Sequence, residues 1–424
     1  FFREETMKKL LIAVLCLMLT GCAAPAPSDG SGPDRSVSPD IPAPSPAASS
    51  APNGESGPPQ ASPETDPQTA ENPTASQEPS ESSLGPQNQE QIIQELLSAM
   101  TLEEKVGQMF FVRCPETGGA ELAAQYKVGG YLLFGRDFKD KTAQQVRDDI
   151  QSYQDASGIP LLIGTDEEGG TVVRASSNPD LFPQREPAPQ TLFAQGGMDL
   201  ILQDARQKSM TLLDLGVNVN FAPVADVSTD PADFIYARSF GQDAQATANY
   251  VAQVVGVMGE EQIGSVLKHF PGYGNNVDTH TGIALDQRPY ETFQTSDFLP
   301  FQAGIQAGAD AVLVSHNIAA SMDESLPASL SPTVHKILRE ELGFDGVVLT
   351  DDLAMDAVME YAQNGSAAVL AIQAGNDMVV TTDFQTQIPQ VIHAVQSGVI
   401  AESQIDQAVT RVLNWKYELG LLGN

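Results

Sequence analysis

GSVLKHFPGYG, residues 264–274, is the stretch that most clearly indicates both the fold and the chemistry of this chain. Its small and apolar start predicts a buried strand that ends in the charged pair Lys268-His269, and the Pro and two Gly that follow predict a loop. The loop continues as NNVDTH and adds Asp278 and His280. Because polar groups are costly to gather where a core strand ends, this cluster favours a functional site over a solvated loop with a satisfied His.

Other apolar runs of similar length are spaced along the chain, with room for a helix between neighbouring runs. Continuous apolar strands are typical of parallel sheets, in which both faces are buried. Eight strand–helix units in roughly 330 residues favour an α/β fold with a single (β/α)8 barrel of the TIM type over two lobes. The predicted strands are Gly107–Val112, Gly130–Phe134, Leu161–Thr165, Val217–Ala222, Gly264–Lys268, Ala311–Ser315, Gly346–Thr350 and Asp377–Val380.

The barrel is expected to begin near residue 89, where the composition changes. Apolar residues occur at helical spacing from Gln91 to Met100. Thr101-Leu102-Glu103-Glu104 then has the capping-box pattern that predicts the start of a second helix. We therefore assign residues 89–424 to the barrel, which leaves the site to be built from the barrel alone.

The N-terminal segment has the pattern of a bacterial lipoprotein signal. Met7-Lys8-Lys9 is a basic start, and Leu10–Leu19 is an apolar run too short for a bilayer, which takes about 20 residues. Leu19-Thr20-Gly21-Cys22 resembles a lipobox, with Cys22 as the lipidated residue; an ordinary secretory signal is the alternative. Residues before Met7 are interpreted as upstream sequence read through, so that residues 1–22 form the signal unit.

Residues 23–88 are predicted to be a disordered linker. They are rich in Pro, Ser, Ala, Gly and acidic side chains and have almost no large apolar ones. Such a segment cannot bury enough surface to offset the entropy of the chain, and its Pro content makes it extended. The simplest interpretation is a spacer that holds the barrel away from the outer face of the cytoplasmic membrane.

The composition excludes some partners. The chain of 424 residues carries a formal net charge of −33. Because nucleic acids and anionic membranes are polyanions, this charge argues against both, apart from attachment through the lipid on Cys22. Of the three Cys, only Cys114 falls in the barrel, so no disulfide is expected there. Cys114 is interpreted as a buried small side chain rather than a catalytic thiol.

Polar side chains follow several predicted strands at their C-terminal ends. In a TIM barrel these ends meet at one face that carries the chemistry, so we expect the side chains to line one mouth. The alternative, that every cluster caps a following helix, fits Asp351 or Asp352 but gives no reason for a Lys-His pair. The segments are Asp166-Glu167-Glu168, Asp226, Lys268-His269, Ser315-His316 and Asp351-Asp352.

Taken in order, these segments resemble glycoside hydrolase family 3, and within it the β-N-acetylglucosaminidase (β-N-acetylhexosaminidase) branch. The resemblance covers about Gln91 to Leu422. There are three departures: Tyr273 stands where the family often has His, the spacer before Asp278 is one residue shorter than is common, and the Arg most often seen straight after Gly169-Gly170 is absent, since the next Arg is Arg174. The motifs are DEEGG at 166–170, FAPVADV at 221–227, ARSFG at 237–241, KHFPGYG at 268–274, DTH at 278–280 and GFDGVVLTDDL at 343–353.

The resemblance implies a role for each matched residue. Asp351 matches the nucleophile, His280 the acid/base, and Asp278 the group that orients His280. No metal and no organic cofactor is implied. His316 matches no role and is interpreted as structural or as part of the wall of the site. The residues that match groups binding the terminal sugar are Asp166, Arg174, Arg238, Lys268 and His269.

A His can take the place of the second carboxylate that most glycosidases use. With an intrinsic pKa of about 6.5, an imidazole can donate and later accept a proton near neutral pH. Asp278 lies two residues before His280, so in an extended loop both side chains point the same way and the carboxylate can orient the ring. The positive charges of Arg238 and Lys268 are expected to keep Asp351 ionised.

These features predict a lipid-anchored, retaining exo-β-N-acetylglucosaminidase that acts on cell-wall or chitin-type oligosaccharides through a glycosyl-Asp351 intermediate. A β-glucosidase or β-xylosidase of the family is disfavoured, because those branches generally have a Glu acid/base. Phosphorolysis stays open, since a His repels phosphate less than a Glu does. A sugar-binding lipoprotein without catalysis shares the lipobox and spacer, but it would need two lobes and has no use for Asp351 as a nucleophile.

Overall fold

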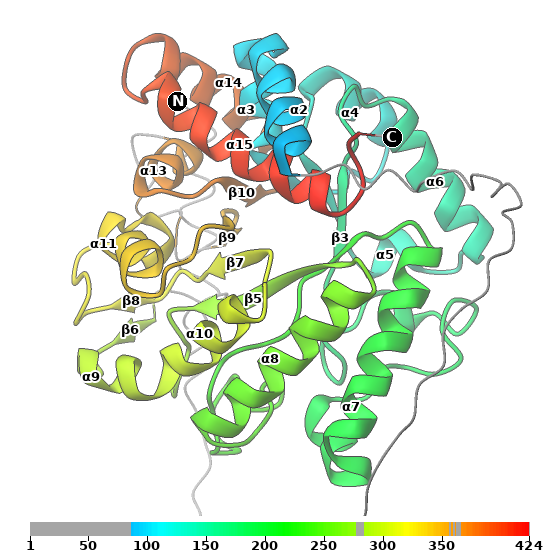
Figure 1. Ribbon diagram of the computed structural model, residues 1–424, viewed down its shortest axis with the longest axis vertical. Coiled ribbons are helices and arrows are strands. Elements are labelled where there is room, and N and C mark those ends of the chain that lie inside the picture. The colour runs from blue at the N-terminus through cyan, green and yellow to red at the C-terminus, as the bar shows by residue number, and fades with distance from the viewer. Residues whose placement is uncertain (1–85, 277–283, 356–357, 359–360, 362–365, 424) are drawn as a thin grey trace, which may run out of the picture. The chain divides into compact units, whose positions relative to one another are not determined.

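The computed structural model describes residues 86–423, apart from 277–283, 356–357, 359–360 and 362–365. Within this part, eight parallel strands form a closed barrel (Figure 1). They are β1 (Phe110–Arg113), β2 (Gly130–Leu133), β3 (Leu162–Thr165), β4 (Val219–Asn220), β5 (Gly264–Phe270), β7 (Ala311–Val314), β9 (Val347–Asp352) and β10 (Met378–Thr381). Each strand pairs with the next along the chain, and β10 closes on β1. The predicted (β/α)8 barrel is confirmed.

Helices alternate with the strands and cover the outside of the barrel (Figure 1). The longer ones are α2 (Pro86–Ala99), α3 (Leu102–Gln108), α4 (Gly119–Tyr126), α6 (Ala143–Asp155), α7 (Pro189–Asp214), α8 (Ala244–Glu260), α10 (Phe298–Gln306), α13 (Ala367–Ala374), α14 (Phe384–Gln396) and α15 (Glu402–Glu418). α15 packs against α2 and α3, so the two ends of the described chain lie side by side. Outside the barrel, β6 (Leu285–Asp286) pairs with β8 (Ile318–Ala319).

The expected first strand, Gly107–Val112, is wrong at its start, because α3 extends to Gln108. The predicted capping box forms: the Thr101 hydroxyl accepts from the Glu104 N–H at 3.2 Å, and the Glu104 carboxylate accepts from the Thr101 N–H at 2.9 Å. At Gly107 an added Cβ would lie 2.5 Å from the carbonyl oxygen of Lys127, so only Gly permits this helix to pack so closely. The other strands are confirmed, with ends that differ by at most two residues.

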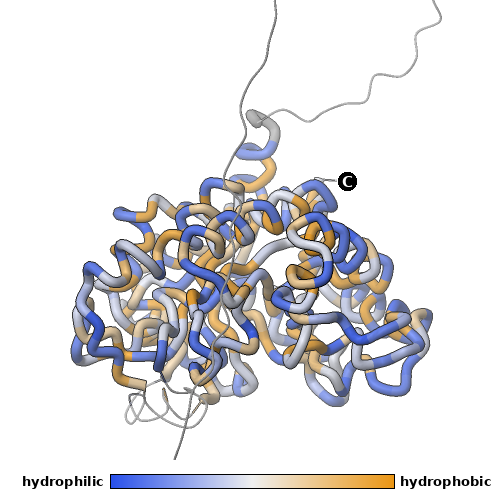
Figure 2. Tube along the Cα trace, turned by 90° about the horizontal axis from the view of Figure 1, so that it is seen from below, coloured by the Kyte–Doolittle hydropathy of each residue, from blue (hydrophilic) through white to orange (hydrophobic). Residues whose placement is uncertain are grey.

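The apolar core has two layers, as expected for strands buried on both faces. Inside the barrel, Phe111 and Phe221 pack edge to face with ring centroids 5.2 Å apart. Trp415 of α15 joins this layer next to Gly264, the first residue of β5, and so closes the N-terminal end of the barrel. The second layer lies between the strands and the helices. Figure 2 shows hydrophobic segments of the chain alternating with hydrophilic ones, which predominate on the outer loops.

Two further expectations concern single features. Cys114, which follows β1, is buried as predicted, and burial raises the pKa of its thiol to about 12, so that almost no thiolate forms at neutral pH. Cys22 lies outside the described residues. Within the described ranges, no helix combines the length and the apolar character needed to cross a bilayer.

Candidate active site

The C-terminal ends of the strands surround a cavity of about 320 Å³, which we call the mouth. This volume lies within the range of small-molecule sites, about 300–1,000 Å³. Apolar side chains such as Leu132 and Leu313 come from within the strands, and the charged residues come from the strand ends and the loops. The mouth is lined by Arg113, Leu132, Phe134, Asp166, Val172, Arg174, Phe221, Arg238, Lys268, His269, Leu313, Asp351, Asp352, Met355 and Val380.

The structure therefore brings together the predicted nucleophile, Asp351, and all of the predicted sugar-binding residues. Asp278 and His280 lie outside the described residues. The described residues on either side of residues 277–283 are hydrogen-bonded. Asn276 Nδ2 donates to Asp286 Oδ2 at 2.7 Å, and the carbonyl oxygen of Ala284 accepts from the N–H of Ile318 at 2.8 Å.

Lys268 and His269 are neighbours in the sequence, yet both line the mouth. In a regular strand, successive side chains point to opposite faces. The register between β5 and β7 shifts here, because Lys268 lies opposite Leu313 and Phe270 lies opposite Val314. His269 is thus an extra residue on β5, and a bulge of this kind re-aims side chains. The bulge explains how a Lys-His pair can serve one site.

Two carboxylates and three cations form a network at the mouth. Lys268 Nζ lies 2.6 Å from Asp166 Oδ1 and 2.6 Å from Glu168 Oε1. Arg238 donates to both oxygens of Glu168, at 2.7 and 3.0 Å, and Arg174 Nη2 lies 3.5 Å from Asp166 Oδ2. Burial alone raises the pKa of Glu168, but Lys268 and Arg238 hold that pKa well below its usual range. The Glu168 carboxylate is therefore ionised at neutral pH, and the groups of the network can form hydrogen bonds with hydroxyl groups.

The tautomer of His269 follows from its partners. Its Nε2 lies 3.1 Å from Arg238 Nη2, and an Arg can only donate, so Nε2 accepts and carries no proton. The proton is on Nδ1, which donates to Asp226 Oδ2 at 2.7 Å. Asp226 is buried and also accepts from the N–H groups of His269 and Tyr273, at 3.1 and 2.8 Å. Asp226 thus holds the imidazole that lines the mouth, a role that the sequence did not reveal.

Asp351 is half-buried near the end of β9, and its Oδ1 accepts from the N–H of Asp352 at 2.8 Å. His316, whose role the sequence left open, supports this strand end. Its Nε2 donates to the carbonyl oxygen of Asp352 at 3.0 Å, and its Nδ1 lies 2.7 Å from Ser329 Oγ. Because His316 is buried and holds the main chain beside Asp351, we interpret it as structural.

Arg113 and Phe134 line the mouth but were not predicted as site residues. The guanidinium carbons of Arg113 and Arg174 lie 4.2 and 5.2 Å from the centroid of the Phe134 ring. Cation–π contacts of this kind stabilise by about 0.5–2 kcal/mol. The sequence did contain a signal for Arg113, because this charged residue directly follows the apolar run FFV at residues 110–112.

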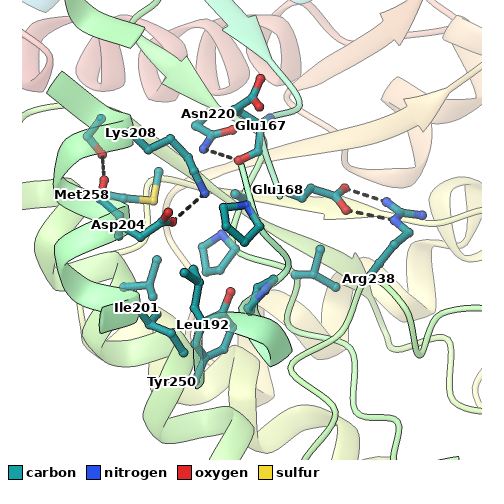
Figure 3. A pocket seen from close by; sticks show the side chains of 18 residues that line it. Glu167, Glu168, Leu192, Ile201, Asp204, Lys208, Asn220, Arg238, Tyr250 and Met258 are labelled. Carbon is teal, nitrogen blue, oxygen red and sulfur yellow. Dashed lines mark hydrogen bonds and ion pairs between the residues drawn. The ribbon is translucent and has the colours of Figure 1, made fainter. Parts of the chain in front are cut away.

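One part of the expected mouth is wrong. Asp166 lines the mouth and Glu168 belongs to its charged network, but both Glu168 and Glu167 border a second cavity, and Glu167 takes no part in the network. Figure 3 shows Glu167 beside a second cavity of about 30 Å³, behind Glu168 and Arg238. That volume suits about one or two water molecules.

The far side of this second cavity carries a charged cluster, of which Figure 3 shows Lys208 and Asp204 of α7. Glu186, in the segment before α7, completes the cluster. Lys208 Nζ lies 3.0 Å from Asp204 Oδ2 and 3.9 Å from Glu186 Oε2. Burial, and then a hydrogen bond with Asp204, raise the pKa of Glu186 to about 8. Among the residues that the structure describes, no three His, Cys, Asp or Glu side chains are grouped as ligands for a metal ion.

Comparison with known proteins agrees with this geometry. Residues 101–415 match the model of the glycosyl hydrolase family 3 N-terminal domain. A protein named beta-hexosaminidase from Stenotrophomonas maltophilia strain R551-3 is 35% identical over 318 residues, which are 72% of this chain and 89% of that protein.

Solved structures show the same relationship. A glycoside hydrolase family 3 β-N-acetylglucosaminidase from Paenibacillus sp. FPU-7 superposes with a TM-score of 0.70 and 31% identity, over 77% of this chain and 64% of that one. This chain thus spans less than two thirds of the Paenibacillus protein. A family 3 glycosyl hydrolase from Mycobacterium smegmatis superposes with a TM-score of 0.68 and 28% identity, over 77% of this chain and 99% of that one. The present chain belongs to glycosyl hydrolase family 3 and is a glycoside hydrolase.

Proposed function

We propose that the protein is a retaining exo-β-N-acetylglucosaminidase, with Asp351 as nucleophile and His280, oriented by Asp278, as acid/base. The observation that carries the proposal is that Asp351 lies in the same mouth as the charged network around Lys268. The names of the relatives, beta-hexosaminidase and β-N-acetylglucosaminidase, support N-acetylglucosamine as the terminal sugar.

The reaction then has two steps. In the first, the Asp351 carboxylate forms a bond to C1 of the sugar while the bond from C1 to the leaving oxygen breaks, and His280 gives its proton to that oxygen. In the second, a water molecule attacks C1, His280 accepts a proton from the water, and the bond between C1 and Asp351 breaks. Two inversions at C1 return the β configuration. Lys268, Arg238 and Asp166 bind the hydroxyl groups of the sugar, and no metal or cofactor takes part.

Trapping the intermediate tests the nucleophile. A slow fluorinated N-acetylglucosaminide should add one sugar to the protein, and peptide mapping should place the sugar on Asp351 and not on Asp352. Asp351→Asn should lose the label and should lower kcat by about 10³-fold or more, because nucleophile removal in a concerted site has effects of this order. A label on another residue, or full activity in Asp351→Asn, would contradict the assignment.

The choice of substrate and acceptor is tested on the wild type. Release from an N-acetylglucosaminide should exceed release from a glucoside or a xyloside. Products formed with and without inorganic phosphate distinguish hydrolysis from phosphorolysis, because only phosphorolysis yields a sugar 1-phosphate. Binding of N-acetylglucosamine without any turnover would favour a sugar-binding lipoprotein instead.

We also propose that the chain is anchored through a lipid on Cys22 at the outer face of the cytoplasmic membrane and acts on cell-wall or chitin-type oligosaccharides. The lipobox pattern and the Pro-rich segment at residues 23–88 support this location. In a bacterial host, the full chain should incorporate a labelled fatty acid and sediment with membranes. Cys22→Ala should abolish both; membrane association that survives this substitution would contradict the proposal.

A further inference from the structure

Glu167 stands between two carboxylates of the mouth but binds a different part of the chain. Its side chain is fully buried, and Oε2 accepts from the N–H groups of Arg174, Ala175 and Ser176 at 2.9, 2.7 and 3.3 Å. Oε1 accepts from the Ser176 hydroxyl at 2.5 Å. A carboxylate on several N–H groups makes strong, charge-assisted hydrogen bonds. Glu167 therefore fixes the main chain of residues 174–176.

The main chain of Glu167 is itself fixed to the barrel. Asn220, the last residue of β4, accepts from the N–H of Glu167 at 3.0 Å and donates to its carbonyl oxygen at 3.2 Å (Figure 3). The main chain that carries the Glu167 carboxylate is thus tied to the C-terminal ends of two adjacent strands, β3 and β4. Ser176 Oγ also accepts from the N–H of Glu186 at 3.0 Å, which ties the same segment to the cluster behind the second cavity.

The segment that Glu167 holds carries Arg174 into the mouth. The chain reaches it through a tight turn in which Gly169 has φ +96° and an added Cβ would lie 2.2 Å from the carbonyl oxygen of Pro187. The side chain of Arg174 is held loosely, by an ion pair of 3.5 Å with Asp166 and a ring contact of 5.2 Å with Phe134, and it is 28% exposed. Because these contacts are long, the position of the Arg174 main chain largely decides where its guanidinium lies.

We propose that Glu167 is a positioning residue for Arg174: its buried carboxylate holds the backbone that places the Arg174 guanidinium at the terminal sugar. The inference rests on the proposed function, because it takes Arg174 as a sugar-binding group. Misplacing such a group by about 1 Å can lower the rate by about 10²-fold. Loss of the Glu167 carboxylate should therefore resemble loss of the Arg174 side chain.

A double-mutant cycle tests this coupling, with kcat and KM measured on a chromogenic N-acetylglucosaminide. Arg174→Ala, Glu167→Gln and Glu167→Met should each lower kcat/KM, by about tenfold or more for Arg174→Ala and Glu167→Met and by a smaller factor for Glu167→Gln. In the Arg174→Ala background, each Glu167 substitution should change kcat/KM by less than about twofold. A role in general stability would lower kcat/KM by the same factor in both backgrounds.

Asp310→Asn is the matched control. Asp310 is a carboxylate near the N-terminal end of β7 that accepts from the Ser265 N–H and hydroxyl, both at 2.7 Å. The Asp310→Asn substitution should lower the melting temperature without changing KM. Multiplicative losses at Glu167 and Arg174, or a wild-type KM in both Glu167 variants beside a raised KM in Arg174→Ala, would overturn the proposal. Absence of N-acetylglucosaminide turnover in the wild type would instead contradict the proposed function.

Discussion

Two lysines are buried at opposite ends of the barrel and have very different surroundings. Lys268 at the mouth is 2% exposed and has carboxylate oxygens of Asp166 and Glu168 within 2.6 Å. Lys416 of α15 is fully buried, and its Nζ donates to the neutral amide oxygen of Gln108 at 2.6 Å. Gln108 stands just before β1, so this contact is at the N-terminal end of the barrel.

The difference shows how position in the fold decides what a buried cation can do. Burial lowers the pKa of Lys416 to about 7, because among the described residues no carboxylate offsets the loss of water. At the mouth, Lys268 and Arg238 hold the pKa of Glu168 well below its usual range, so Lys268 has an ionised carboxylate as a partner. A paired cation next to a cavity can bind hydroxyl groups, whereas an isolated one inside a packed end mainly costs stability.

The largest effect is expected when the cation at the mouth is removed. Lys268→Met leaves Asp166 and Glu168 near one another without their shared partner, and breaking a buried pair in this way costs about 3–5 kcal/mol. The free energy of unfolding, measured with urea, should fall by this amount, and kcat/KM should fall with it. Unchanged stability in Lys268→Met would show that the network is not held by this lysine.

The comparison of Lys268 with Lys416 also shows which features could be predicted from the sequence and which could not. Lys268 and Asp351 were predictable, because a charged residue directly after an apolar run lies at a strand end, and strand ends converge in a barrel. The direction of the Glu167 side chain was not predictable, because its hydrogen bonds to the main chain of residues 174–176 form only when the chain folds. Lys416 gave no signal, because charged residues are normal in an amphipathic helix and usually face solvent.

Contacts between segments that are distant in the sequence could not be predicted either. The sequence placed His269 at the mouth but could not show that Asp226 fixes its tautomer, since that bond of 2.7 Å joins β5 to the loop that follows β4. The strand pattern predicted the barrel because continuous apolar runs need burial on both faces. It misplaced the first strand because the role of Gly107 depends on the carbonyl oxygen of Lys127, which is brought close only by folding.

An intermediate effect is expected for the carboxylate behind His269. In Asp226→Asn the amide can donate to Nδ1, which would move the imidazole proton to Nε2 and set two donors against each other at Arg238. A hydrogen bond to a charged group contributes about 1.5–3 kcal/mol, so kcat/KM should fall by roughly 10- to 100-fold. Asp377→Asn, at the start of β10, is the control: it should lower stability and leave KM unchanged. A wild-type kcat/KM in Asp226→Asn would contradict the assigned tautomer.

The last effect concerns Lys416, and it is measured as the change in the free energy of unfolding with pH. The unfolded chain keeps this proton up to a pH of about 10.4, whereas the folded protein loses it near pH 7. Between these values the unfolded state binds more protons, so this group makes the free energy of unfolding rise with pH by at most about 1.4 kcal/mol per unit. Below pH 7 the full cost of burying the charge is present.

Lys416→Met should remove this slope, so that its stability relative to the wild type is greatest at pH 6 and declines toward pH 9. The lost bond to Gln108 lowers the stability of the variant by a constant of about 1–3 kcal/mol, which shifts the difference but does not change its slope. Lys336→Met, at a side chain 68% exposed, should leave the slope as it is. Urea unfolding at pH 6, 7, 8 and 9 measures all three proteins. If the free energies of unfolding of the wild type and of Lys416→Met changed with pH in parallel, Lys416 would keep its proton when buried. The two ends of the barrel would then not differ in the way that their surroundings indicate.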